Sequence, residues 1–76
     1  MNLNNLKEGE KAIILFIKGD GKLKKRLLAL GCIEGTNITF KRSSPFGDPI
    51  IVNFRGFDLA IRRKDAKNII IQIVEE

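Results

Sequence analysis

The sequence contains no histidine, tryptophan or tyrosine, and it has one cysteine and two prolines. Without histidine the chain lacks the commonest general base and the commonest transition-metal ligand. Cys32 has no second cysteine or histidine with which to hold zinc or ferrous iron, because such sites need several ligands. Phosphate-binding Gly-x-x-x-x-Gly-Lys and nucleophilic Gly-x-Ser-x-Gly motifs are also missing. The sequence therefore predicts a protein that is not an enzyme, with no catalytic residue, metal site or cofactor.

Long hydrophobic runs are equally scarce. The longest uncharged apolar run, residues 12–17, has six residues, whereas a membrane-spanning helix needs about 20. Residues 1–5 lack the charged start and long apolar stretch of a secretion signal. A single cysteine precludes an internal disulfide, which is typical of a reducing compartment. We expect a soluble, cytoplasmic protein.

The residues that are present indicate a small basic globular domain. The 76 residues are 43% hydrophobic and 30% charged, which suits one folded domain spanning residues 1–76. Lysine and arginine total 14 against nine acidic residues, a net charge of +5. This balance favours anionic partners, namely nucleic acid, the inner surface of a membrane or an acidic protein face.

The first half of the chain predicts one strand and one helix. Residues 12–18 are rich in β-branched and aromatic side chains and suit a buried strand. In residues 22–30 the leucines at positions 23, 27 and 30 share one helix face, which we expect to pack into the core. Asp20 is the predicted N-cap, and Gly31 suits the left-handed position that ends a helix.

From Thr36 onward the hydrophobic period changes to two, which is typical of strands. The predicted strands are residues 36–42, 50–55, 57–61 and 69–74, with a basic link over 62–68 that includes one helical turn. Leu3 and Leu6 are expected core anchors, and the aromatic rings expected in the core are Phe16, Phe40 and Phe57. The fold class is mainly β: a small barrel of about five strands, curled to remove exposed edges, with one short α-helix after the first strand.

Several motifs in a fixed order carry a family resemblance. They are Leu6 with Gly9, Ala12-Ile13-Ile14, Arg26-Leu27-Leu28-Ala29-Leu30-Gly31 with Gly35, Arg42-Ser43-Ser44-Pro45-Phe46-Gly47-Asp48-Pro49-Ile50, then Gly56, Leu59-Ala60-Ile61-Arg62, Ala66 and Ile69. Together they resemble the FeoA family of ferrous-iron transport. The resemblance implies an SH3-like fold, a cytosolic location and a role supporting the membrane GTPase transporter FeoB. The family is similar to the C-terminal SH3-like domain of DtxR-type metal-dependent repressors.

Two surfaces are candidates for partner binding, one on the helix and one in a loop. Their residues are Lys22, Lys24, Lys25 and Arg26 on the helix, and Pro45, Phe46, Gly47 and Asp48 in the loop. The helix residues suit an acidic face of the transporter or anionic headgroups, and equally a solvated helix surface. The loop offers an exposed apolar tip, and equally each of its residues has a turn-forming reason to be there.

Two further features of the sequence are each open to more than one interpretation. Cys32 is either a metal ligand or redox thiol, or a small hydrophobic residue packed against Leu27. A second basic cluster is either a contact surface or a solvated one, and it consists of Arg62, Arg63, Lys64 and Lys67.

The functional expectation is a cytosolic accessory protein of bacterial ferrous iron uptake. It acts by protein–protein interaction with the cytosolic domain of a FeoB-type transporter, peripheral to the inner face of the membrane when docked. The alternatives are a basic nucleic-acid-binding module and a metal-responsive regulatory domain. Nucleic acid is not the expected partner, because stacking needs exposed aromatic rings. The sequence assigns no oligomeric state.

Overall fold

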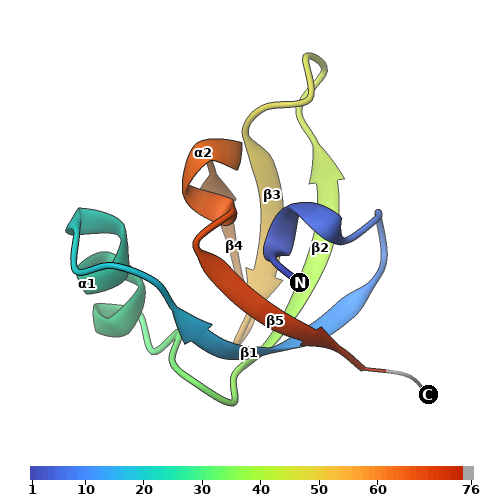
Figure 1. Ribbon diagram of the computed structural model, residues 1–76. Coiled ribbons are helices and arrows are strands. Elements are labelled where there is room, and N and C mark those ends of the chain that lie inside the picture. The colour runs from blue at the N-terminus through green and yellow to red at the C-terminus, as the bar shows by residue number, and fades with distance from the viewer. Residues whose placement is uncertain (75–76) are drawn as a thin grey trace.

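Five antiparallel strands form one strongly bent sheet in the order β4-β3-β2-β1-β5 (Figure 1). The computed structural model describes residues 1–74. In chain order the elements are a 3-10 helix η1 (Leu3–Asn5), β1 (Lys11–Ile17), α1 (Lys22–Ala29), β2 (Asn37–Ser43), β3 (Ile50–Phe54), β4 (Phe57–Ile61), α2 (Arg63–Ala66) and β5 (Ile69–Ile73).

The sheet is curled but not closed, so the prediction of a barrel without free edges is corrected. Within the described residues, β4 pairs only with β3, and β5 pairs with β1. The outer side of β5 is partly covered by the N-terminus, where the Ile71 N–H donates to the Met1 carbonyl at 3.0 Å. The outer side of β4 has no strand beside it in the described part of the chain. The bending is assisted by register shifts in β1, between Ile14 and Phe16, and in β2.

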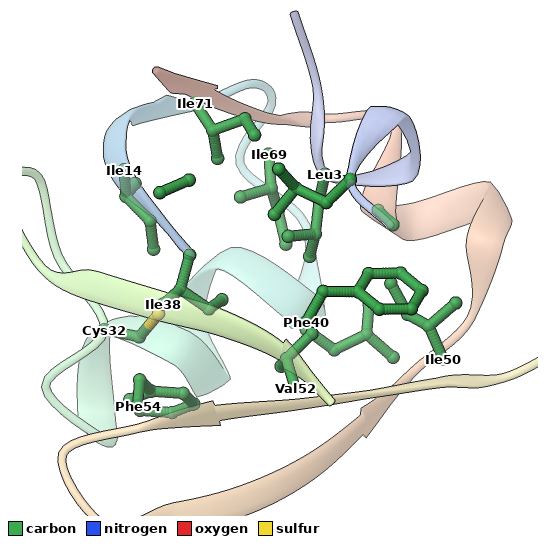
Figure 2. Close-up of a cluster of buried hydrophobic side chains, with 14 of the residues drawn as sticks. Leu3, Ile14, Cys32, Ile38, Phe40, Ile50, Val52, Phe54, Ile69 and Ile71 are labelled. Carbon is green, nitrogen blue, oxygen red and sulfur yellow. The ribbon is translucent and has the colours of Figure 1, made fainter. Parts of the chain in front are cut away.

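The core follows the period-two pattern of the strands (Figure 2). Alternate side chains of the strands turn inward and are buried: Ala12, Ile14, Ile38, Phe40, Ile50, Val52, Phe54, Ile69 and Ile71. Leu3 and Leu6 are buried with them, as predicted. The N-terminal lead-in is therefore part of the core, because η1 places Leu3 against the strand residues.

Two of the aromatic assignments were wrong. Phe40 is buried, but Phe16 and Phe57 are each 51% exposed. The register shift after Ile14 breaks the inside–outside alternation of β1, so that Ile17 rather than Phe16 turns inward. Phe57 is the first residue of β4 and lies at the end of the sheet, beside the buried ring of Phe54.

The end of α1 matches the sequence prediction. Gly31 has a φ of +84°, its N–H donates to the Leu28 carbonyl at 3.0 Å, and the Cys32 N–H donates to the Leu27 carbonyl at 2.8 Å. These two bonds form a Schellman motif, which satisfies carbonyl groups that the helix end leaves unpaired.

The start of α1 and its leucine face differ from the prediction. The N-cap is Gly21 rather than Asp20, and no side chain caps the helix start. Leu27 is buried and Leu23 packs partly against the core, but Leu30 is exposed because the helix has already ended at Ala29. Also, α2 provides the expected helical turn in the basic link, so the fold has two short α-helices rather than one.

Candidate functional site

Exposed apolar side chains gather around α1. On one side a groove of about 300 Å³ lies between α1 and the β3–β4 hairpin. We call it the α1 groove, and its lining residues are Arg26, Ala29, Leu30, Phe54, Phe57, Asp58 and Leu59. On the other side a smaller hollow of about 190 Å³ is lined by Phe16, Ile17, Lys24, Leu28, Ile33 and Glu34. Apolar surface thus flanks the helix on both sides.

The groove exists because α1 is short and the hairpin turn is tight. Leu27 is the one fully buried side chain of α1, so the rest of the helix stands away from the sheet (Figure 1). The turn consists of Arg55 and Gly56, with φ of +53° and +86°, the combination expected for a two-residue hairpin. It places Phe57 next to Phe54, with ring centroids 5.9 Å apart and planes tilted by 60°. The two rings form an apolar wall, of which Phe57 is the accessible part.

Charged groups of both signs border the α1 groove. Arg26 lies on the helix side and Asp58 on the strand side. The Asp58 Oδ1 accepts a hydrogen bond from the Asn53 side-chain amide at 2.8 Å, which fixes the position of that carboxylate. Of the other predicted helix residues, Lys22 and Lys25 are exposed, and Lys24 is half-buried in the smaller hollow on the other side of α1. Their role in partner binding stays a prediction.

The loop that joins β2 to β3, residues 44–49, is held in one shape by its own hydrogen bonds. The Ser44 N–H donates to the Pro49 carbonyl at 3.0 Å, and the Gly47 N–H donates to the Ser44 carbonyl at 2.7 Å. Gly47 has a φ of +85°, which accounts for glycine at that position. The turn-forming interpretation of this segment is therefore confirmed for Gly47, and the loop presents Phe46 at its tip.

Arg63 of α2 fixes the same loop from outside. Its guanidinium Nε donates to the Gly47 carbonyl, and its backbone N–H donates to Asp48 Oδ1 at 2.9 Å. Arg63 is itself held by η1, because the Asn4 side-chain amide donates to the Arg63 carbonyl at 2.9 Å. The sequence places Arg63 in a basic cluster that is either a contact surface or a solvated one, and it gives no sign of this bracing role, since the partners lie 15 and 16 positions away.

The structure does not bring the two predicted surfaces together. The loop enters β3 at Ile50, whereas the α1 groove begins at Phe54, the last residue of the same strand. Five strand residues span roughly 13 Å at about 3.3 Å each. Figure 1 shows the loop at the top of the molecule and α1 at the side. A partner that covers the α1 groove therefore contacts a different face from one that covers Phe46.

Cys32 is a core residue. Its side chain is fully buried, and Figure 2 shows the sulfur pointing into the cluster with Ile38 and Phe54. Burial raises the pKa of the Cys32 thiol to about 11, so the nucleophilic thiolate is a minor form at neutral pH. The packing interpretation of Cys32 is confirmed.

Among residues 1–74, no three histidine, cysteine, aspartate or glutamate side chains gather to hold a metal ion. None of the helices described here is long and apolar enough to cross a membrane.

Comparison with known proteins identifies the family. A family model described as the FeoA domain matches residues 1–73. The chain belongs to the FeoA family. Its fold is that of solved FeoA structures, among them the solution structure of FeoA from Chlorobium tepidum, with a TM-score of 0.93 and 35% identity over 99% of this chain and 71% of that one. The fold likeness extends to Stenotrophomonas maltophilia FeoA, described as an SH3 domain protein and solved with zinc, with a TM-score of 0.80, 22% identity and coverage of 95% and 89%. The SH3-like, mainly β fold is thus shown.

Two curated relatives carry functional names. A Campylobacter jejuni protein with the name "Putative Fe(2+) transport protein A" is 35% identical over 97% of this chain and 100% of its own length. A Porphyromonas gingivalis protein is named as a fusion of Fe(2+) transport protein A with the Fe(2+) transporter FeoB. It is 31% identical over 97% of this chain, which corresponds to 9% of the fusion protein. In that relative a FeoA domain and FeoB form one polypeptide.

Proposed function

We propose that this FeoA-family chain is a cytosolic accessory protein of ferrous iron uptake that docks on the cytosolic part of a FeoB-type transporter. The observation that carries the proposal is the relative in which FeoA and FeoB are fused. Fusion keeps two binding partners at a high effective concentration, which is useful when they must meet repeatedly. A separate chain of the same family then reaches its partner by reversible docking.

The α1 groove is the surface we assign to that docking. Its wall is apolar at Phe57, Leu30 and Leu59, and Arg26 and Asp58 border it with opposite charges. A volume of about 300 Å³ accommodates one or two aliphatic side chains of a partner segment. Burying one such side chain contributes about 1.5–3 kcal/mol, so the groove alone supports a weak, reversible contact.

The basic residues of α1 orient an acidic partner and raise the rate of association with it. Lys22, Lys24, Lys25 and Arg26 lie along α1, with Arg26 at the groove and Lys24 at the hollow on the other side, and together they attract an acidic partner face during encounter. Such contacts are screened by salt over about 10 Å at 0.1 M ionic strength, so docking is expected to weaken as salt rises. The chain itself supplies binding, and the chemistry of GTP and of iron belongs to the transporter.

Isothermal titration of the purified chain with the transporter's soluble cytosolic part tests this proposal. We expect the combined reversal Lys24→Glu, Lys25→Glu and Arg26→Glu to weaken binding about tenfold or more. The matched control reverses three exposed cations at the other end of β3, Lys41, Arg42 and Lys64, and leaves binding close to wild type. Equal binding by the wild type and the α1 variant contradicts docking through this helix.

A second pair of variants separates the apolar contribution from charge. Phe57→Ala removes the accessible wall of the groove, whereas Phe46→Ala removes an exposed ring from the distant loop. Both residues are at least half exposed, so both variants are expected to fold. We expect Phe57→Ala alone to weaken binding to the transporter.

Exposed aromatic rings also bear on the second candidate function, nucleic-acid binding. The structure exposes Phe16, Phe46 and Phe57, so the argument that the rings are buried no longer opposes it. Phe46 and Phe57 nevertheless lie at opposite ends of β3 and do not form the continuous stacking track that single strands need. A gel shift with single-stranded DNA at low salt tests this function, and binding there with loss at high salt supports it.

A further inference from the structure

The tip of the 44–49 loop carries the most exposed large hydrophobic side chain among residues 1–74. Phe46 is 98% exposed, compared with 61% for the next, Met1. An apolar ring held so fully in water contributes nothing to the fold. Such an exposed apolar ring indicates contact with a lipid phase or with the surface of another molecule.

The backbone of this loop is already partly satisfied within the protein. The N–H groups of Ser44 and Gly47 donate hydrogen bonds to carbonyls within the loop, and the Gly47 carbonyl accepts a hydrogen bond from Arg63. Pro45 and Pro49 have no N–H to satisfy. Moving polar backbone groups out of water is costly when they lack partners, so these bonds lower the cost of placing the tip in a less polar medium.

The base of the loop is basic. Residues 41–50 and 61–65 include five cations, namely Lys41, Arg42, Arg62, Arg63 and Lys64, and two acids, Asp48 and Asp65. Strand pairing brings these segments to one end of the sheet, since Arg42 pairs with Ile51 and Ile50 pairs with Ile61. Arg63 holds the loop base through its N–H, which donates to Asp48 Oδ1, and through its guanidinium, which donates to the Gly47 carbonyl, so the other four cations are the ones free to meet phosphates. This end of the molecule therefore combines an apolar tip with a cationic collar.

We propose that this loop is a membrane-contacting element. Phe46 enters the interfacial region of an anionic lipid surface, while the cations at the loop base lie near the lipid phosphates. The combination of a shallow apolar anchor and basic residues is what reversible interfacial binding requires, since neither signal alone holds a protein on a bilayer. A projecting tip is better suited to insertion into lipid than to a protein interface, because the hot-spot residues of protein interfaces are enclosed by surrounding contacts.

This inference goes beyond docking through the α1 groove and does not depend on it. The loop and the groove lie at opposite ends of β3, so both contacts can be made at the same time. A chain held by lipid at the loop diffuses in two dimensions, which shortens the search for any membrane protein. Failure of the lipid contact leaves the proposed docking on the transporter untouched, and the reverse also holds.

The absence of tryptophan and tyrosine makes a direct test simple. Phe46→Trp introduces the single indole of the chain at the tip, and Phe57→Trp places one on the distant groove as the matched control. Each variant is titrated with vesicles of phosphatidylcholine alone and with vesicles containing phosphatidylglycerol. We expect a blue shift of emission for Phe46→Trp with the anionic vesicles, weakened by salt, and none for Phe57→Trp.

Vesicle sedimentation of the unlabelled chain completes the test. Phe46→Ala is expected to lower partitioning onto anionic vesicles about tenfold, and Lys41→Glu with Arg42→Glu by a similar factor. Three results overturn the proposal. The first is that the emission of Phe46→Trp does not shift at saturating lipid. The second is a shift that depends on protein concentration without lipid, which would mean that a second copy of the chain covers the tip. The third is loss of transporter binding in Phe46→Ala when the wild type binds no vesicles, which would mean that the tip contacts a protein.

Discussion

The guanidinium of Arg63 donates a hydrogen bond to the carbonyl oxygen of Gly47, 16 positions earlier in the chain. The same side chain donates from its terminal nitrogen to the Ser43 hydroxyl at 3.2 Å. Through this residue α2 braces the 44–49 loop, so that an otherwise solvent-surrounded tip has a defined position. Preorganisation of this kind lowers the entropy lost when a loop binds a partner.

Arg63→Ala is expected to loosen the loop and to lower the free energy of unfolding by about 1–2 kcal/mol, because charge-assisted bonds to Gly47 and Ser43 are lost. Backbone relaxation by NMR should show lower order parameters for residues 45–48. Lys64→Ala, an exposed neighbour, serves as the control and should change neither quantity. A rigid loop in the Arg63 variant would mean that the loop's internal bonds suffice.

Gly31→Ala is expected to destabilise the protein by about 1–2 kcal/mol, since a φ of +84° is costly for any residue with a Cβ. The new Cβ would also lie 3.4 Å from the Nε of Arg55, in contact with a flexible side chain, so the cost comes from the backbone conformation. The control is Gly21→Ala at the other end of the same helix, where φ is −75° and no atom lies within 4 Å. Urea unfolding should show a clear loss for Gly31→Ala and a smaller one for Gly21→Ala, which replaces glycine at the N-cap by the less favoured alanine but strains no backbone dihedral.

Gly21→Asp is expected to stabilise the protein by roughly 0.5–1 kcal/mol. The helix start has no side-chain cap, and Gly21 already has the extended conformation of an N-cap residue. An aspartate there accepts a hydrogen bond from a free N–H and places a negative charge at the positive end of the helix dipole. The thermal unfolding midpoint should rise relative to wild type, whereas Asp20→Ala should leave it nearly unchanged because Asp20 is not the cap.

Cys32 predicts a loss of stability at alkaline pH. Burial raises the pKa of its thiol from 9.0 to about 11, so the unfolded chain releases this proton at lower pH than the folded chain. The folded state then binds more protons between these values, and the free energy of unfolding falls as pH rises through that window. Relative to Cys32→Ala, the wild type should lose about 2 kcal/mol of advantage between pH 8 and pH 11.

Urea titrations of both proteins at the two pH values measure this difference, in which the identical titration of the lysines cancels. A stability gap that stays constant with pH would mean that the thiol ionises as readily in the folded chain as in the unfolded one.

Much of the fold follows from local patterns in the sequence. The alternation in residues 36–42 and 69–74 predicts which side chains of β2 and β5 are buried, because strand geometry leaves no other choice. Gly31 predicts the helix end for an equally local reason. The β1 prediction fails at Phe16, because the register shift between Ile14 and Phe16 reverses the alternation there, and no residue type marks that shift.

The candidate site is less accessible to sequence reasoning. The cations of α1 can be recognised in the sequence, but the α1 groove cannot. Phe57 belongs to an alternating segment, and that pattern is the same whether the ring is buried in the core or exposed at the end of the sheet. The prediction of Leu30 in the core is wrong because the predicted helix, residues 22–30, is one residue longer than α1, which ends at Ala29. The bracing of the loop by Arg63 depends on the packing of η1, α2 and the β2–β3 connection, which sequence spacing does not reveal.

Titration of the isotopically labelled chain with the soluble cytosolic part of a FeoB-type transporter, followed by amide chemical shifts, tests docking through the α1 groove most directly. We predict that the perturbed amides cluster in residues 22–31 and 54–59, while residues 44–49 remain unchanged. Saturable shifts confined to the 44–49 loop, or no shifts at transporter concentrations of several hundred micromolar, would contradict it.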